Sequence, residues 1–279
     1  MKTAVLSGKG GTGKTFVSVN LAYAAGNSVY VDCDVEEPDG RLFLKPTDIK
    51  REDVFTLVPD FDMEKCIQCR QCVSFCRFNA IVFIKDNPKI FNEVCHACGG
   101  CALVCPANAI TEKKRKIGVI ETGKHGNITA VTGIMDISEA SGVKIIEAAL
   151  KKGASFNADT EIIDCPPGSA CSVNASLKDA DSCIIVAEPT AFGFHNFLMV
   201  HELVSILKKP CFVVINKQDK PYEPLENYCR EQGIEIAARI PFDRKIAKLI
   251  SVGEIAAEKD KKAAEIFSHI LSVVKGEKI

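Results

Sequence analysis

The sequence predicts an α/β protein built on a doubly wound, mostly parallel sheet, with a small α+β unit inserted into one of its surface loops. Short apolar runs alternate with segments of helical pattern along most of the 279 residues, as in parallel β-α-β units. Between 61 and 112 this alternation stops, and eight cysteines fall there in two regular groups. We therefore expect a discontinuous sheet domain, 1–60 and 113–279, and an insert at 61–112.

The expected elements follow the chain in order. Apolar runs predict strands at 3–7, 28–32, 128–132, 161–165, 183–187 and 211–215. Helical patterns predict helices at 14–25, 141–152, 195–208 and 222–232. The runs at 183–187 and 211–215 are apolar throughout, which fits strands at the centre of a sheet whose two faces are both covered.

Composition and charge limit the class of protein. The formal net charge is −1, which gives no bulk electrostatic reason to expect a nucleic-acid partner. The first residues lack the apolar segment of a signal peptide, and no run of about 18 apolar residues predicts a membrane span. We expect a cytoplasmic protein without stable membrane insertion. The apolar positions of 263–275 predict a final helix packed on the core, with a membrane-anchoring tail as the alternative.

A glycine-rich stretch at 8–15 reads GKGGTGKT and matches the phosphate-binding pattern G-x-x-x-x-G-K-[ST]. It follows a predicted strand and opens a predicted helix, which is the context that this loop requires. Backbone N–H groups at the N-terminus of that helix can surround a phosphate. We expect Lys14 to reach the β- and γ-phosphates of ATP and the hydroxyl of Thr15 to bind Mg²⁺. The residues expected to hold the nucleotide here are Gly8, Lys9, Gly10, Gly11, Thr12, Gly13, Lys14 and Thr15.

A carboxylate ends one of the apolar strands. Asp164 lies in EIIDCPPG, residues 161–168, where a carboxylate can hold Mg²⁺ through water. The alternative is a turn residue at the strand end, since the Pro-Pro-Gly turn that follows would explain a polar residue there.

The eight clustered cysteines repeat the spacing C-x₂-C-x₂-C-x₃-C twice. This is the run of bacterial ferredoxins with two [4Fe–4S] clusters, in which the fourth cysteine of each run serves the other cluster. We expect one cluster on Cys66, Cys69, Cys72 and Cys105, and the second on Cys76, Cys95, Cys98 and Cys101. Zinc is the alternative, but zinc sites usually pair C-x₂-C with a distant second pair.

The early lysine of the loop supports a more specific resemblance. Residues Lys9–Thr15 read K-G-G-x-G-K-[ST], which resembles the deviant Walker A ATPases, a P-loop NTPase family that includes MinD, ParA, Mrp and the nitrogenase iron protein. The resemblance implies ATP hydrolysis by a homodimer with ATP at the interface, in which Lys9 crosses to the partner's nucleotide. It identifies Asp34, at the end of VDCD, with the switch I carboxylate that positions Mg²⁺ and the attacking water. Asp164 then matches Walker B, and Gly168 the switch II glycine.

The resemblance extends to the C-terminal part of the chain. It implies adenine contacts at Asn216, Pro241 and Asp243. Asn216 has an alternative role as a turn former at a strand end, and Asp243 as a helix N-cap. The order of motifs, with two cysteine runs between VDCD and Walker B, is similar to that of MinD-superfamily ATPases with an inserted ferredoxin domain.

Together these motifs predict an ATPase whose nucleotide-dependent dimer switch is coupled to electron transfer, through two [4Fe–4S] clusters, to an unidentified redox partner protein. Two alternatives remain open. An Fe–S carrier or assembly ATPase of the Mrp type usually holds a transient cluster on one C-x-x-C pair between subunits, whereas eight ligands favour permanent clusters. A positioning ATPase like MinD needs a membrane-targeting tail.

Overall fold

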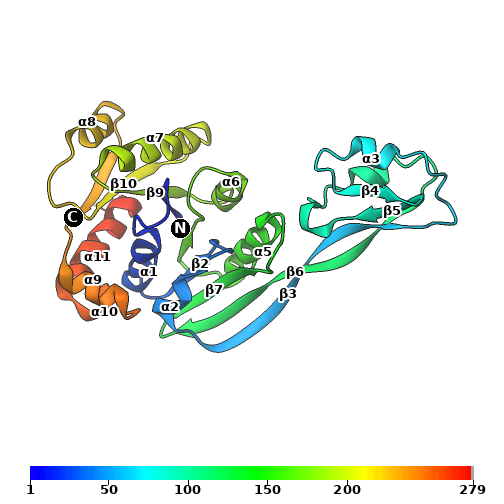
Figure 1. Ribbon diagram of the computed structural model, residues 1–279. Helices are drawn as coiled ribbons and strands as arrows, with labels where there is room; N and C mark the ends of the chain where they lie inside the picture. Colours follow the sequence, from blue (N-terminus) through cyan, green and yellow to red (C-terminus); the bar gives the residue numbers. More distant parts are fainter. Residues whose placement is uncertain (278–279) are drawn as a thin grey trace.

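The computed structural model describes residues 1–277, which form a sheet with helices on both faces and a smaller unit set apart from it (Figure 1). The nine strands of the described sheet lie in the order β11-β10-β9-β1-β8-β2-β7-β6-β3. Every pair from β11 to β7 is parallel, and β6 is antiparallel to both of its neighbours, so the predicted doubly wound, mostly parallel sheet is confirmed. The strands are β1 (Lys2–Leu6), β2 (Ser28–Asp32), β3 (Thr47–Phe61), β6 (Ile110–His125), β7 (Ile128–Met135), β8 (Thr160–Asp164), β9 (Ser182–Ala187), β10 (Cys211–Asn216) and β11 (Glu235–Ile240).

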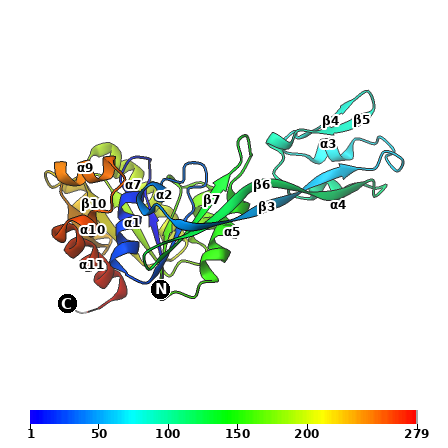
Figure 2. The same cartoon turned by 90° about the horizontal axis from the view of Figure 1, so that it is seen from below.

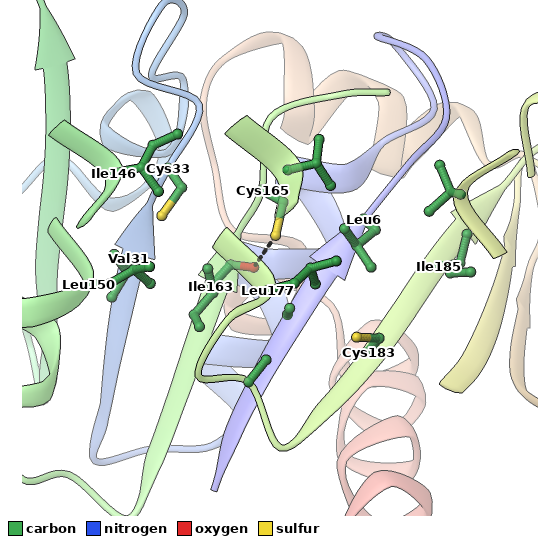
Figure 3. Packing of buried hydrophobic residues seen from close by; sticks show 14 of the residues in the cluster. Leu6, Val31, Cys33, Ile146, Leu150, Ile163, Cys165, Leu177, Cys183 and Ile185 are labelled. Carbon is green, nitrogen blue, oxygen red and sulfur yellow. Dashed lines mark hydrogen bonds between the residues drawn. The ribbon is translucent and has the colours of Figure 1, made fainter. Parts of the chain in front are cut away.

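Helices cover both faces of this sheet. The helices on one face are α1 (Lys14–Ala24), α2 (Gly40–Leu44), α9 (Arg244–Ser251), α10 (Ala256–Lys259) and α11 (Lys261–Lys275). Those on the other face are α5 (Val143–Ala154), α6 (Cys171–Leu177), α7 (Ala191–Ile206) and α8 (Glu223–Glu231). The strand alternation sends neighbouring side chains into two separate cores, so that Leu6 packs on the α5–α8 side and Val5 on the α1 side. Figure 3 shows the first of these cores, where Ile163 of β8 lies near Leu150 of α5 and Leu177 of α6.

The final helix α11 packs against α1. Phe267 is 1% exposed, and its ring meets that of Phe16 edge-on with 5.5 Å between centroids. Ile270 and Leu271 are buried in the same core. The prediction of a core-packed final helix is therefore confirmed. Among residues 1–277, no helix is both long and apolar enough to cross a membrane.

Two long strands carry the cysteine-rich segment away from the sheet. β3 and β6 pair from end to end, but β7 accompanies β6 only over 118–125. Beyond Gly118 the two strands continue as a ribbon that leads to the small unit (Figures 1 and 2). The polar segment 112–116, which reads EKKRK, predicts the flank of an insert in a surface loop. In the structure this segment is part of β6, and lysines of the ribbon pair with acids across it, as Lys113 does with Asp60 at 2.7 Å. The expected insert limits fall at the end of β3 and inside β6.

The small unit repeats one backbone pattern. It contains a hairpin of β4 (Ile81–Ile84) and β5 (Asn87–Ile90), a 3-10 turn at Asn92–Val94, and the short helices α3 (Gln71–Phe75) and α4 (Gly100–Leu103). Left-handed backbone angles recur in pairs that lie 29 positions apart: Gln68 and Ala97, Arg70 and Gly99, and Asn79 and Asn108. Because residues with a Cβ rarely adopt this region, the recurrence indicates that the two cysteine runs fold alike.

Candidate functional site

A cleft of about 780 Å³ opens at the carboxyl ends of the central parallel strands. This is the edge at which doubly wound sheets bind their ligands. Its walls come from the glycine-rich loop after β1, the segment after β2, the Pro166–Pro167 turn after β8, and the loop between β11 and α9. Asp34, Asn216, Pro241 and Asp243 therefore meet the phosphate loop in one cleft.

The loop at 8–15 has the backbone shape that a phosphate site requires. Gly11 and Gly13 have φ angles of 78° and 93°, which residues with a Cβ rarely adopt. A Cβ on Gly8 would lie 2.2 Å from the backbone oxygen of Asn196 in α7, so close packing also demands glycine there. Thr15 is the second residue of α1 and lines the cleft. The loop thus presents the N-terminus of α1 to the cleft.

Lys14 is held by two carboxylates, Asp34, which lines the cleft with it, and Asp164, which is fully buried and does not line the cleft. Its Nζ donates to Asp164 Oδ1 at 2.7 Å and to Asp34 Oδ2 at 3.4 Å. Burial alone would lower the pKa of Lys14, but the charges of Asp164, Asp34 and Asp32 outweigh burial and raise it. Lys14 is therefore a permanent positive charge, in contact with both carboxylates predicted to bind Mg²⁺.

Two further side chains orient Asp164, and neither was expected from the sequence. Ser18 Oγ lies 3.1 Å from Asp164 Oδ1 and shares its single proton between that oxygen and the carbonyl of Lys14 at 2.8 Å, and the hydroxyl of Tyr30 donates to Asp164 Oδ2 at 2.9 Å. Burial, followed by the charge of Asp164, raises the pKa of Tyr30 well above its usual value, so the hydroxyl keeps its proton. The ring leaves no room at Gly40, where a Cβ would lie 2.1 Å from the Tyr30 oxygen. Contacts this distant in sequence have no local pattern that would reveal them.

Asp32 orders the segment that carries Asp34. The backbone N–H of Asp34 donates to Asp32 Oδ1 at 3.2 Å, and that of Gly40 donates to Oδ2 at 3.0 Å. Burial raises the pKa of Asp34, with Lys14 opposing the rise, and burial raises the pKa of Asp32 well above its usual range. These carboxylates are poorly solvated and repel one another, so a divalent cation would be favoured beside them. The predicted ligands Thr15, Asp34 and Asp164 offer oxygen donors of the kind that fits Mg²⁺.

Gly168 joins the turn after β8 to the phosphate loop. Its φ angle is 90°, in the region that favours glycine. Its N–H donates to the carbonyl of Ser7 at 2.9 Å. The expected switch II glycine thus borders the loop but is not among the residues that line the cleft.

Lys9 folds back onto its own chain. Its Nζ forms an ion pair with Glu188 at 2.5 Å and lies 5.5 Å from the centroid of the Phe192 ring. Lys217 donates to the same Glu188 at 2.8 Å and to the carbonyl of Gly11 at 2.7 Å. Burial alone would raise the pKa of Glu188, but its hydrogen bonds with the two lysines outweigh burial and lower it. Glu188, which was not expected from the sequence, therefore ties Lys9 down within a single chain.

The three residues expected at the adenine base have different contacts. Asn216 is 5% exposed, and its Nδ2 donates to the carbonyl of Thr12 at 2.7 Å. A Cβ on Gly13 would lie 2.2 Å from this amide, so Asn216 braces the phosphate loop. The side chain of Asp243 caps α9 by accepting a backbone hydrogen bond at 2.6 Å, as its alternative reading anticipated. Pro241 lines the cleft.

The structure gathers the eight clustered cysteines around two small hollows. Each hollow takes three cysteines from one run and the fourth from the other, which is the grouping derived from the spacing. One is bordered by Cys66, Cys69, Cys72 and Cys105, and the other by Cys76, Cys95, Cys98 and Cys101.

Backbone N–H groups point at two of these sulfurs. Ala80 donates to Cys76 Sγ at 3.4 Å and Ala109 to Cys105 Sγ at 3.3 Å, at equivalent places in the repeat. Hydrogen bonds of this kind tune cluster ligands. Within residues 1–277, no three Cys, His, Asp or Glu side chains converge closely enough to hold a single metal ion. A cubane needs no such convergence, because each of its four sulfur ligands binds a different iron atom, and each hollow is bordered by four cysteines.

The cleft lies in a segment of the chain that matches a known protein family. Residues 3–256 match the family described as the CobQ/CobB/MinD/ParA nucleotide binding domain. The chain belongs to this family. The glycine-rich loop and its surrounding carboxylates are therefore parts of a CobQ/CobB/MinD/ParA nucleotide-binding domain.

Individual proteins similar to this one match different lengths of its chain. It is 31% identical over 279 residues to the uncharacterized protein MJ0578 of Methanocaldococcus jannaschii, a match that covers 99% of this chain and 96% of that protein. The structure of the cell division ATPase MinD of Pyrococcus furiosus matches with a TM-score of 0.62 and 17% identity over 99% of both chains, a likeness of fold alone. The uncharacterized ferredoxin MJ0722 of M. jannaschii is 43% identical over 56 residues, which is 19% of this chain and 73% of that protein.

Proposed function

We propose that this protein is an ATP-hydrolysing iron–sulfur protein in which a nucleotide-dependent dimer switch is coupled to electron transfer through two [4Fe–4S] clusters. The observation that carries the proposal is the presence, in one chain, of a phosphate loop with acidic residues and of eight cysteines around two hollows. We call residues 62–109, between β3 and β6, the cysteine module. The short ferredoxin likeness supports the same assignment.

The cleft has the charges that ATP hydrolysis needs. Lys14 lies at the loop, where its Nζ can exchange the carboxylate contact at 2.7 Å for the β- and γ-phosphates. Thr15, Asp34 and Asp164 would hold Mg²⁺, which neutralises charge on the phosphates when bound. The Asp34 side chain is 19% exposed, so it can orient a water molecule from the cleft toward the terminal phosphate.

The position of Lys9 fits a switch that needs a second copy of the chain. In a single chain Lys9 is bound to Glu188, which Lys217 also contacts. A nucleotide in a facing protomer offers phosphate oxygens, to which a lysine binds by strong charge-assisted hydrogen bonds. We propose a homodimer with ATP at the interface, in which each Lys9 leaves Glu188 for the partner's nucleotide.

Each hollow of the cysteine module offers four thiolates, the ligand number of a [4Fe–4S] cluster. When bound, such clusters supply one-electron redox chemistry. Cys69 and Cys98 are exposed, which places one ligand of each set at the surface. Electrons would therefore pass to an unidentified redox partner protein that docks on the module.

Metal and sulfide analysis of anaerobically prepared protein tests the proposal. We expect about eight iron atoms and about eight inorganic sulfides per chain, together with Mg²⁺-dependent ATP hydrolysis. Stoichiometric zinc without sulfide would contradict the cluster assignment and leave the ATPase assignment standing. Rapid transfer of the iron to an apo-acceptor protein would favour the carrier alternative.

Removal of one hydroxyl tests how Asp164 is oriented. Tyr30→Phe keeps the buried ring but removes the donor to Asp164 Oδ2. We expect the rate of ATP hydrolysis to fall about tenfold, because a hydrogen bond to a charged group contributes about 1.5–3 kcal/mol and Asp164 keeps its other donors. Tyr228→Phe is the control, since that hydroxyl contacts His201 at 3.1 Å, away from the cleft. Equal rates in both variants would mean that Asp164 needs no help from Tyr30.

A further inference from the structure

Arg115 of β6 joins the cysteine module to the loop that follows β7. Its guanidinium forms a two-pronged ion pair with Glu139, in which Nη2 lies 2.7 Å from Oε2. The same Nη2 donates at 3.5 Å to the backbone carbonyl of Asn92 in the module. The Arg115 side chain is 22% exposed and that of Glu139 9%, so solvent screens the pair less than a surface pair. Figure 2 shows β7 running beside β6 in the direction of the module.

The Asn92 end of this contact reaches the second set of cysteines. The carbonyl that faces Arg115 also accepts the N–H of Cys95 at 3.2 Å. Cys95 borders the hollow that it shares with Cys76, Cys98 and Cys101. A movement of Arg115 would therefore act on a backbone group that is bonded to a proposed cluster ligand.

The Glu139 end of the contact reaches the nucleotide cleft. Met135, the last residue of β7, donates its N–H to the carbonyl of Val35 at 2.9 Å. Gly142, just before α5, lines the cleft, and a Cβ there would lie 2.5 Å from a methyl group of Val35. Val35 follows Asp34 directly in the chain. The loop 136–142 is thus packed between the segment that carries Asp34 and the module.

Two polar atoms at this contact are buried. Within residues 1–277, Asn92 Oδ1 and Arg115 Nε are buried without a hydrogen-bond partner. Buried polar atoms without partners are uncommon and unfavourable. Both atoms belong to residues that already touch, through Arg115 Nη2 and the carbonyl of Asn92. The contact that joins Arg115 to the module therefore has hydrogen-bonding capacity that is not used in this arrangement.

We propose that the Arg115–Glu139 contact transmits the state of the nucleotide cleft to the second set of cysteines, so that a nucleoside triphosphate with Mg²⁺ beside Asp34 changes the surroundings of Cys95. This rests on the proposed function, which supplies the ligand, and it adds the route by which the two halves affect each other. By linkage, if the nucleotide shifts the equilibrium at the second set of cysteines by some factor, the state of those cysteines must shift nucleotide affinity by the same factor.

Amide hydrogen exchange of the full chain tests this route, with and without Mg²⁺ and a non-hydrolysable ATP analogue. In the wild-type protein the analogue should change exchange at 92–98 by about fivefold or more, the lower end of typical coupling between sites. In Arg115→Gln the change at 92–98 should be lost, while the analogue still binds to the cleft. Glu139→Gln should give the same loss, and it serves as the second variant if Arg115→Gln does not fold.

Arg51→Gln is the matched control. Arg51 of β3 pairs with Glu121 of β6 at 2.6 Å, in the stretch where β7 still accompanies β6. This variant also removes an Arg–Glu pair, one that joins β3 to β6, but it should respond to the analogue as the wild type does.

Equal responses at 92–98 in wild type and Arg115→Gln would overturn the proposal, and so would a wild-type protein that binds the analogue without any response there. Iron, sulfide and ATP turnover, measured on the same samples, report separately on the proposed function. A wild-type protein that does not bind the analogue would overturn both.

Discussion

Replacement of Lys14 with alanine is expected to abolish ATP hydrolysis, with a loss of about a thousandfold or more. Lys14 is the buried cation of the cleft, 2.7 Å from Asp164 and 3.4 Å from Asp34. Without it, the transferring phosphoryl group loses its lysine, and the two carboxylates lose their shared partner. Turnover at saturating ATP, with nucleotide binding measured separately, checks this result.

The same replacement should destabilise the chain in a pH-dependent way. Breaking a buried ion pair by removing one partner costs about 3–5 kcal/mol. The pKa of Asp34 is raised by burial even though Lys14 lowers it, so removal of Lys14 raises it further. A carboxyl with a raised folded pKa binds more protons in the folded state, so the stability of Lys14→Ala should fall as pH rises from about 4. Thermal unfolding across this pH range measures the effect.

Two further variants serve as a substitute and a control for Lys14→Ala. Lys14→Met keeps the length and apolar stem, and it replaces Lys14→Ala if that variant does not fold. Lys45→Ala removes a lysine with 54% side-chain exposure that pairs with Glu254, and it should hydrolyse ATP at the wild-type rate. Normal turnover in both Lys14 variants would show that 8–15 is not the phosphate loop.

Pairs of cysteine replacements should lose iron in a pattern that reveals the crossed ligand sets. Cys69→Ala alone should lower iron from about eight to about four atoms per chain. Adding Cys105→Ala should cause little further loss, because both residues border the same hollow. Adding Cys76→Ala instead should remove nearly all the iron, because Cys76 borders the other hollow. Iron and sulfide analysis of anaerobic samples measures each step.

The reverse pattern would contradict the crossed assignment. If each run held its own cluster, the double replacement of Cys69 and Cys76 would keep about four irons, and that of Cys69 and Cys105 would lose them all. Cys171→Ala is the control, since Cys171 is an exposed cysteine outside the module and should leave the iron content unchanged.

The sequence predicted the elements whose signal is local. The phosphate loop is recognisable because its glycines are required by the backbone, as the φ of 93° at Gly13 shows. The central strands are recognisable because burial on both faces demands continuous apolar runs, as in Cys183–Ala187. The cysteine groups follow from spacing alone, since the repeat brings each fourth cysteine to the other hollow.

Features that depend on distant contacts could not be predicted. β3 and β6 carry many charged residues because their ribbon is largely exposed, and such a composition also suits a loop. Glu188, Tyr30 and Arg115 act on partners far away in the chain, so no spacing rule marks them. The contact of Asn216 at the base stays a prediction, and the hydrogen bond from its amide to the carbonyl of Thr12 has no local signal in the sequence.

Coupling between nucleotide binding and cluster redox state is tested most directly by a pair of potentiometric titrations of the anaerobic protein. One is made with Mg²⁺ and a non-hydrolysable ATP analogue, and the other without nucleotide. We expect the midpoint potential of at least one cluster to differ by about 60 mV or more, since a coupling of about 1.4 kcal/mol shifts a one-electron potential by that amount. Identical midpoint potentials, with ATP affinity unchanged on reduction, would contradict the coupling and leave the module as a tethered electron carrier.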